Sequence, residues 1–286
     1  MSITIKNLTH VYNEGMPFEK TALSNINIEI ETGEFVGIIG HTGSGKSTLI
    51  QMFNGLLKPT KGEVYINHEN IHGDKTNKKE IRQKVGLVFQ YPEYQLFEMT
   101  VKEDVAFGPK NLGLSKEEVE ERVKYALDAV GLDESYYEKS PFELSGGQKR
   151  RVAIAGVLAM NPDTLILDEP TAGLDPKGRN ELFEQLQKMH KELGLTIVLI
   201  SHSMEDVARY VQKLFVLYKG QVAYQGTPRE VFAHGKKLEE IGLAMPQIRY
   251  IMEALKDKGM DVTEDVLTVE EAAAKLIAYL KVKGEA

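Results

Sequence analysis

Polar and apolar side chains alternate in three short stretches of the chain. These stretches are residues 2–8, 27–30 and 62–67. Alternation with a period of two is typical of a strand that has one face buried and the other in water. The pattern therefore predicts a small antiparallel sheet.

Four other stretches are short, continuous runs of apolar residues. They are residues 35–39, 85–89, 164–167 and 196–200. Such runs are typical of parallel strands that are covered on both faces. Each lies near a helical pattern, so the sequence predicts a doubly wound α/β core.

A helical pattern replaces the strand patterns between Gln90 and Met160. Residues 115–130 begin with Ser115 and have Glu118 three positions later, which is the pattern of a capping box. Apolar residues recur there at helical spacing: Val119, Val123, Leu127 and Val130. We therefore expect a mostly helical insert, about residues 91–160, inside the α/β core.

The chain ends in a separate helical pattern. Three amphipathic stretches follow from about Lys236, and the last begins with Thr268 and has Glu271 three positions later. Its apolar residues are predicted to share one face: Ala272, Ala273, Leu276, Ile277 and Leu280. These patterns predict a core domain of residues 1–235 and a helical region of residues 236–286.

Composition limits the partners that the chain can have. Its 286 residues include no cysteine, which excludes disulfides and cysteine-bound metal clusters. The net charge of −7 argues against a broad nucleic-acid surface. The longest nearly apolar stretch, residues 153–160, is far shorter than the roughly 18 residues of a membrane span. If the protein serves a membrane, we expect it to dock onto another protein.

The apolar run at 35–39 leads directly into a match to the phosphate-loop pattern, which a helical pattern follows. The matching residues are Gly40, His41, Thr42, Gly43, Ser44, Gly45, Lys46, Ser47 and Thr48. In this context the glycines let backbone N–H groups wrap the phosphates of ATP. Lys46 would reach the β- and γ-phosphates, and the Ser47 hydroxyl would bind Mg²⁺. The alternative is a glycine-rich turn that matches by chance.

Two carboxylates follow the apolar run at 164–167. Asp168 stands where a magnesium ligand belongs in such folds, and Glu169 could polarise the attacking water. The alternative is a pair of solvated carboxylates at a strand end. Their position after a phosphate loop favours the catalytic interpretation.

Residues 144–148 distinguish among phosphate-loop proteins. They read Leu-Ser-Gly-Gly-Gln and place Ser145 and Gly147 at the start of a predicted helix, where backbone N–H groups can receive a phosphate. Together with the two preceding motifs, this stretch resembles the signature of ATP-binding cassette proteins. The resemblance implies a head-to-tail dimer, in which Ser145 and Gly147 contact ATP held by the other subunit's phosphate loop.

The resemblance also implies roles for single residues. Gln90 is similar to the family's glutamine that contacts Mg²⁺ and water and senses the membrane partner. His202 is similar to the histidine that contacts the γ-phosphate, and Tyr12 to the aromatic residue that stacks on adenine. Residues 172–175 are similar to the loop that crosses the dimer interface. Without the family pattern, such a Gln, His or Tyr near a strand end is more often structural.

Residues 89–113 narrow the resemblance. They contain Phe-Gln-Tyr-Pro-Glu-Tyr-Gln-Leu-Phe from position 89 and Asp-Val-Ala-Phe-Gly-Pro from position 104. This stretch of sequence is similar to that of the ATPase subunits of energy-coupling factor (ECF) transporters, which import vitamins and transition-metal ions. These transporters have two paralogous ATPases, and the resemblance is stronger to the second. The helical region of residues 236–286 matches the dimerisation region of that family.

The resemblance implies an ATPase that uses ATP and Mg²⁺ and works as a peripheral subunit at the cytoplasmic face of the cell membrane. Expected partners are a second, paralogous cassette ATPase or another copy of this chain, a transmembrane coupling subunit and, through the complex, a substrate-capturing membrane protein. Two alternatives stay open: the ATPase of a binding-protein-dependent importer, and a soluble cassette protein that acts on nucleic acid or ribosomes. A single cassette without a heptad run argues against the second.

Large apolar side chains gather just after Gln90, at Tyr91, Tyr94, Leu96 and Phe97. They could pack under the helical insert as ordinary core. Their density, with polar residues between them, is also the composition of an interface. We predict that residues 91–97 form part of a groove that receives cytoplasmic helices of the membrane subunit.

Overall fold

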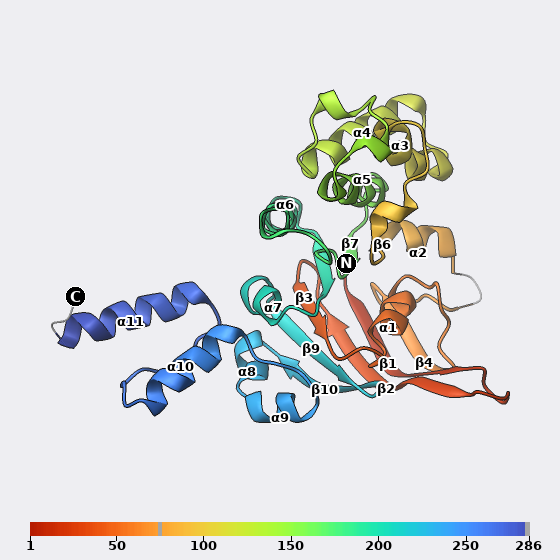
Figure 1. Cartoon of the computed structure of the whole chain (residues 1–286). Coiled ribbons are helices and arrows are strands. Elements are labelled where there is room, and N and C mark those ends of the chain that lie inside the picture. Colours follow the sequence, from red (N-terminus) through yellow and green to blue (C-terminus); the bar gives the residue numbers. More distant parts are fainter. Residues whose placement is uncertain (74–75, 284–286) are drawn as a thin grey trace.

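The computed structural model describes residues 1–73 and 76–283, which form two sheets and a set of helices (Figure 1). The smaller sheet has the strand order β2-β1-β4-β5 and antiparallel pairing. Its strands are β1 (Ile3–Tyr12), β2 (Lys20–Ile30), β4 (Lys61–Ile66) and β5 (Glu69–Asn70). The predicted antiparallel sheet is confirmed, although β1 and β2 are longer than the alternating stretches. Bulges explain the difference, because the register of β1 with β2 shifts between Leu8 and His10 and between His10 and Val11, so the alternation is lost beyond residue 8.

The larger sheet has the strand order β10-β9-β3-β8-β7-β6. Its strands are β3 (Phe35–Ile39), β6 (Val85–Val88), β7 (Thr164–Asp168), β8 (Thr196–Ile200), β9 (Lys213–Tyr218) and β10 (Gln221–Gly226). The four predicted strands are confirmed and pair in parallel, as β9 does with β3. The antiparallel hairpin of β9 and β10 was not predicted. The sequence contains a signal for it, because the buried apolar run of β9 is followed by Lys219 and Gly220. Their φ values of 48° and 76° suit a tight hairpin turn.

Helices cover both faces of the larger sheet. They are α1 (Lys46–Phe53), α2 (Lys78–Lys84), α6 (Pro176–Leu193) and α7 (Met204–Tyr210). Helix α1 packs between the two sheets, where Leu49 and Phe53 join a core with residues of both. Helix α6 packs on the opposite face, where Phe183 and Leu186 meet Leu165 and Leu167 of β7. The sheet is therefore buried on both faces, which is the reason for its continuous apolar runs.

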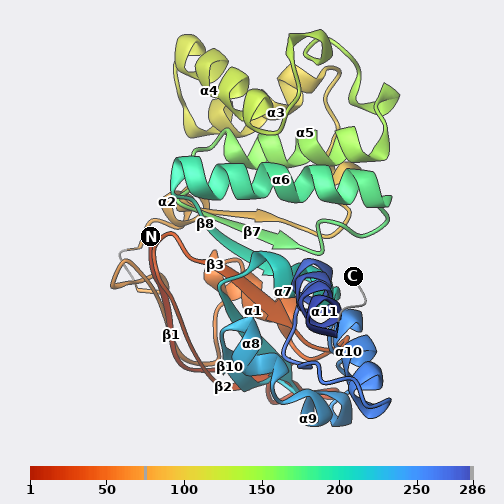
Figure 2. The same cartoon turned by 90° about the vertical axis from the view of Figure 1, so that its left-hand side faces the viewer.

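Only helices occur between β6 and β7, and Figures 1 and 2 show them gathered at one end of the molecule. They are η1 (Pro92–Gln95), α3 (Val101–Leu112), α4 (Lys116–Ala129), η2 (Glu134–Tyr136), η3 (Pro141–Glu143) and α5 (Gly146–Leu158). The predicted capping box of α4 is confirmed. The Glu118 backbone N–H donates to Ser115 Oγ at 3.2 Å, and the Ser115 N–H donates to Glu118 Oε2 at 2.8 Å.

In the part of the chain that the structure describes, four helices follow β10, and two of them, α10 and α11, project to one side of the molecule (Figure 1). The four are α8 (Pro228–Phe232), α9 (Gly235–Glu240), α10 (Gln247–Asp257) and α11 (Val269–Lys283). As predicted, Thr268 Oγ1 accepts a hydrogen bond from the Glu271 N–H at the start of α11. Of the five apolar residues predicted to share one face of α11, Ala272 and Leu276 pack against α10, while Ala273 and Ile277 are exposed. Five apolar residues at this spacing make a stripe wider than one neighbouring helix covers.

Candidate nucleotide site

A glycine-rich loop joins β3 to α1, and two of its glycines have no room for a side chain. Gly40 and Gly45 have φ values of 157° and 107°. A Cβ atom on Gly40 would collide with the Leu217 carbonyl oxygen, and one on Gly45 would lie 2.8 Å from the Ala22 carbonyl oxygen. Because only glycine fits, the loop can turn tightly and present its backbone N–H groups at the start of α1.

Lys46, the first residue of α1, bends back over this loop. Its Nζ donates to the carbonyl oxygen of Gly40 at 2.6 Å and of His41 at 3.2 Å. Burial lowers the pKa of Lys46, while the charges of Glu169 and Asp168 raise it. The ammonium group is thus held at the loop by weak carbonyl partners, which phosphate oxygens can replace with stronger, charge-assisted hydrogen bonds.

Ser47 and Asp168 provide oxygen atoms next to the loop. Ser47 Oγ donates to Asp168 Oδ2 at 3.3 Å. Asp168 ends β7 and is only 8% exposed, and its burial, followed by the charge of Glu169, raises its pKa. A hydroxyl and a carboxylate fit Mg²⁺, which is commonly held by one or two protein oxygens together with the substrate's phosphates. The described residues contain no cluster of three or more His, Asp or Glu that could hold a metal ion without a substrate.

Gln90, Glu169 and His202 meet in one cluster. Gln90 Nε2 donates to Glu169 Oε2 at 3.0 Å, and His202 Nε2 lies 2.8 Å from Glu169 Oε1. These residues follow β6, β7 and β8, which are neighbours in the larger sheet. The backbone N–H of Glu169 donates to the Ile200 carbonyl oxygen, which fixes a left-handed turn with a φ of 50°. The structure therefore brings these three predicted residues together at the carboxyl ends of parallel strands.

A cavity of about 410 Å³ connects this cluster to the loop. Most of the predicted residues line it: Tyr12, Thr42, Gly43, Gly45, Lys46, Ser47, Thr48, Gln90, Glu169 and His202. The Tyr12 hydroxyl lies 3.2 Å from Thr48 Oγ1, and the Tyr12 ring is 37% exposed. Lys20 and Ala22 of β2 also line the cavity, and no sequence motif marks them.

Four predicted residues of the loop and the magnesium site do not line this cavity: Gly40, His41, Ser44 and Asp168. The His41 ring turns away, because its Nδ1 lies 2.7 Å from the Thr42 carbonyl oxygen and its ring packs against Tyr218. Ser44 is fully buried, and its hydroxyl has no hydrogen-bond partner. At Gly40, His41 and Ser44, the loop can therefore contact a ligand through its backbone rather than through side chains.

Ser145 and Gly147 are also absent from the cavity lining. Ser145 is the exposed N-cap of α5, where its Oγ accepts the Gln148 N–H at 3.3 Å and its own N–H donates to Gln148 Oε1 at 2.9 Å. The capping box shapes a helix N-terminus that faces solvent in this chain. A single chain thus holds two separate phosphate-receptive helix ends.

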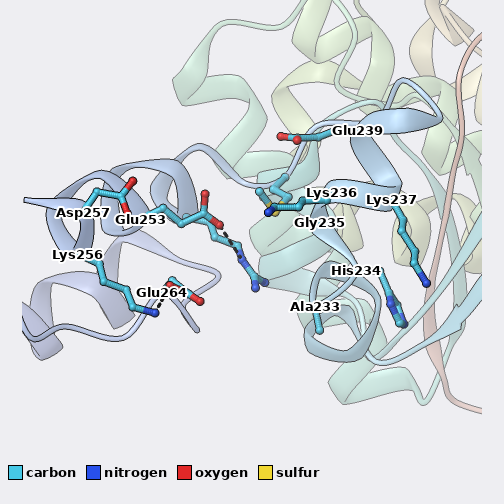
Figure 3. Close-up of a pocket in the computed structure, with 12 residues that line it drawn as sticks. Ala233, His234, Gly235, Lys236, Lys237, Glu239, Glu253, Lys256, Asp257 and Glu264 are labelled. Atoms are coloured by element: carbon cyan, nitrogen blue, oxygen red, sulfur yellow. Dashed lines mark hydrogen bonds and ion pairs between the residues drawn. The ribbon is translucent and has the colours of Figure 1, made fainter.

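A larger cavity of about 590 Å³ lies between α9 and α10 (Figure 3). Charged residues dominate its lining, and Lys256 pairs with Glu264 at 2.7 Å while Glu239 accepts the Tyr250 hydroxyl at 2.6 Å. None of the predicted nucleotide-site residues lines it. This cavity is distinct from the nucleotide site.

A groove of about 640 Å³ lies between α2, η1, α3 and α5. Three of the four apolar residues predicted to form part of such a groove, Tyr91, Tyr94 and Phe97, are exposed by 43%, 84% and 57% but do not line this one. Leu96 does line the groove, as predicted, although it is only 8% exposed and also belongs to the core under the insert. A charged residue at this position would therefore disturb folding as well as docking.

We expect Asp168→Asn to abolish ATP hydrolysis and yet to stabilise the nucleotide-free protein. The pKa of Asp168 is raised on folding, so its charged form destabilises the fold above that pKa. The variant should therefore have a higher Tm than the unmodified protein at pH 7. The difference should shrink as the pH falls through the raised pKa of Asp168 and vanish only well below the ordinary Asp pKa of about 3.9, where the carboxyl is protonated in both states. Thermal unfolding across this pH range, with exposed Asp128→Asn as control, checks the prediction, and a lower Tm at pH 7 would contradict it.

Comparison with known proteins identifies the family. The ABC transporter family matches residues 23–172. The energy-coupling factor transporter ATP-binding protein EcfA2 of Clostridioides difficile is 57% identical, with 99% of each chain covered. The protein of the same name from Clostridium tetani is 58% identical, with 99% of each chain covered. The one from Enterococcus faecalis is 52% identical, with 100% of each chain covered. The likeness therefore includes the C-terminal helices.

Solved structures agree with this assignment. The structure of cbiO1 from Clostridium perfringens, described as part of the ABC transporter complex cbiONQ, has a TM-score of 0.75 and 43% identity. It covers 88% of this chain and 98% of its own. The dimeric cassette MJ0796 bound to ADP and Pi has a TM-score of 0.69 and 35% identity, over 79% of this chain and 98% of its own. This chain belongs to the ATP-binding cassette ATPases, and within them to the EcfA2 family of energy-coupling factor transporter ATP-binding proteins.

Proposed function

We propose that the chain hydrolyses Mg-ATP to energise an ECF-type importer of vitamins or other micronutrients. The observation that supports this most is the cluster of Gln90, Glu169 and His202 beside the phosphate loop and its buried lysine. Near-identical length and high identity to EcfA2 proteins favour this family over a binding-protein-dependent importer.

The phosphate loop and its neighbours hold the nucleotide. Backbone N–H groups of residues 40–45 and the start of α1 surround the phosphates, and Lys46 contacts the β- and γ-phosphates. Ser47 and Asp168 would hold Mg²⁺, with Gln90 at its edge, and the ion when bound neutralises charge on the phosphate oxygens. Tyr12 lies above Thr48 at the rim of the cavity and stacks on the adenine ring.

Glu169 orients the attacking water and accepts its proton, since its carboxylate faces the cavity. His202 and Gln90 each contact one oxygen of this carboxylate and hold its plane in place. When ATP is bound, the His202 imidazole turns toward the γ-phosphate and stabilises the charge that develops there. The same side chain thereby links nucleotide occupancy to the position of the base.

Two chains are needed to complete a site. Ser145 and Gly147 at the exposed start of α5 close over ATP bound to the phosphate loop of a second cassette. Dimerisation of the related cassette MJ0796 supports this arrangement. The partner is a paralogous cassette ATPase or a second copy of this chain, and residues 236–286 add a dimerisation surface on which Ala273 and Ile277 are exposed.

The groove between α2 and α5 receives a cytoplasmic helix of the transmembrane coupling subunit. Apolar side chains of Phe107, Leu112 and Met160 line it, and Lys79 and Arg82 stand at its edge. Such a surface fits an amphipathic helix with acidic residues on one flank. No helix among residues 1–73 and 76–283 could span a membrane. In the proposed complex, the chain works as a peripheral subunit at the cytoplasmic face, and a separate membrane protein captures the substrate.

The function is tested by purifying the chain with its membrane partners and reconstituting the complex in vesicles. Native mass spectrometry identifies the subunits, and uptake of a vitamin in the presence of ATP measures transport. Recovery with the membrane subunits of a binding-protein-dependent importer, in place of a coupling subunit, would contradict the proposal.

Phe107→Asp should prevent assembly with the coupling subunit while ATP binding stays intact. Phe107 is 45% exposed in the groove, so the charge costs little folding energy but meets the apolar face of the docked helix. We expect at least a roughly 30-fold weaker association, because interface hot spots contribute about 2 kcal/mol or more. Tyr125→Asp on α4, with 42% exposure, is the matched control. Normal assembly of the Phe107 variant would place the docking surface elsewhere.

A further inference from the structure

Arg150 of α5 joins two segments that belong to different parts of the site. It is only 2% exposed. Its Nε and Nη2 donate to the two carboxylate oxygens of Glu93, at 3.2 and 2.8 Å. Its Nη1 donates to the carbonyl oxygens of Pro170 and Ala172, at 2.7 and 2.8 Å. One guanidinium therefore connects η1 with the turn that follows β7.

Each of these segments has a separate role. Glu93 lies in η1 only three residues after Gln90, and the next residues of that segment, Gln95 and Leu96, line the groove. Pro170 and Ala172 follow Glu169, and the Ala172 N–H donates to the Glu169 carbonyl oxygen at 3.1 Å. A displacement of η1 at the groove can therefore be transmitted through Arg150 to the turn that contains Glu169.

Two links run side by side between the segments. Gln90 contacts the Glu169 side chain, and Arg150 ties Glu93 to the backbone just beyond it. The Gln90 link joins the segments through the side chain of Glu169, which His202 also contacts, whereas the Arg150 link acts on the backbone of the turn. The Arg150 link is the more rigid of the two, because a bidentate guanidinium pair fixes direction as well as distance. The left-handed φ of Glu169 also needs such support from its surroundings.

We propose that Arg150 is a positioning residue that couples occupation of the groove to the placement of Glu169. When the docked helix shifts η1, Glu93 moves the guanidinium, and the guanidinium moves the carbonyl groups that hold the turn after Glu169. Arg150 is buried and does not line the nucleotide cavity. This inference rests on the proposed function for the occupant of the groove, but the link to Glu169 lies within this chain.

The test uses two variants in the complete transporter. Glu93→Gln removes one charge of the pair and leaves the carbonyl contacts of Arg150, whereas Arg150→Lys keeps the charge but cannot reach all four acceptor oxygens at once. The controls are Glu134→Gln, which breaks an exposed ion pair with Lys124 in the same insert, and Arg151→Lys, the next residue of α5. The kcat and KM for ATP are measured with and without the coupling subunit, together with uptake and Tm.

Both variants should lower kcat about tenfold with KM for ATP changed less than about twofold, since misplacing a reacting group costs rate rather than binding. The stimulation of kcat by the coupling subunit should fall toward one, and both controls should behave as the unmodified protein does. A lower Tm with unchanged kcat and stimulation would overturn the proposal and leave Arg150 as a structural ion pair. If Arg150→Lys does not fold, Glu93→Gln decides alone. If the unmodified complex shows no uptake, the proposed transport function is wrong. The kcat of the purified ATPase dimer still tests the link between Arg150 and Glu169 in that case.

Discussion

Glu169→Gln is expected to reduce ATP turnover by about 10²–10⁴-fold, the contribution of a positioned general base, while ATP binding stays intact. The amide has nearly the shape of the carboxylate, so contacts with Gln90 and His202 can persist, and Lys46 and the loop are untouched. An amide cannot accept the proton of water, so the bound nucleotide stays unhydrolysed. The closed dimer should then accumulate.

Phosphate release, nucleotide binding and the mass of the ATP-bound complex measure these effects in one preparation. Glu181→Gln, an exposed carboxylate of α6 that pairs with Lys177, serves as the matched control. If the variant hydrolyses ATP at a rate within a few-fold of that of the unmodified protein, Glu169 is not the general base. Loss of ATP binding together with hydrolysis would instead assign it to holding the nucleotide.

Ser145→Arg should inactivate the nucleotide site of the partner cassette and spare binding at the chain's own phosphate loop. A long cation at the start of α5 blocks the approach of the helix N-terminus to a bound phosphate, and it also removes the cap. Loss of the cap alone costs about 0.5–2 kcal/mol of stability. Ser145→Ala removes the cap without the block and is therefore the control.

A dimer that contains one Ser145→Arg chain and one Lys46→Ala chain separates the two sites. When both changes lie in one chain, each site of a mixed dimer carries one lesion. When they lie in different chains, both lesions fall on the same site and the other stays intact. Activity is therefore expected only in the second arrangement, and equal activity in both would contradict a head-to-tail dimer.

Local features of the site could be predicted because they depend on neighbours in the chain. The phosphate loop is recognisable since a buried strand, three glycines and a helix start follow one another within about a dozen residues. The capping box at Ser115 is likewise local, because its hydroxyl reaches an N–H only three residues on. The buried strands follow from continuous apolar runs. The resemblance to a family then assigned roles that no spacing could assign.

Tertiary structure decided what depends on contacts between distant residues. Gln90, Glu169 and His202 meet because β6, β7 and β8 are adjacent, an order that the sequence does not state. Leu96 is buried while its neighbour Phe97 is exposed, since η1 packs against α5 on one side only. The pairing of Glu93 with Arg150 bridges 57 positions. Side-chain chemistry and local backbone preference are properties of the sequence, but which surfaces face each other depends on how the packed elements exclude water, and that is settled only in the folded chain.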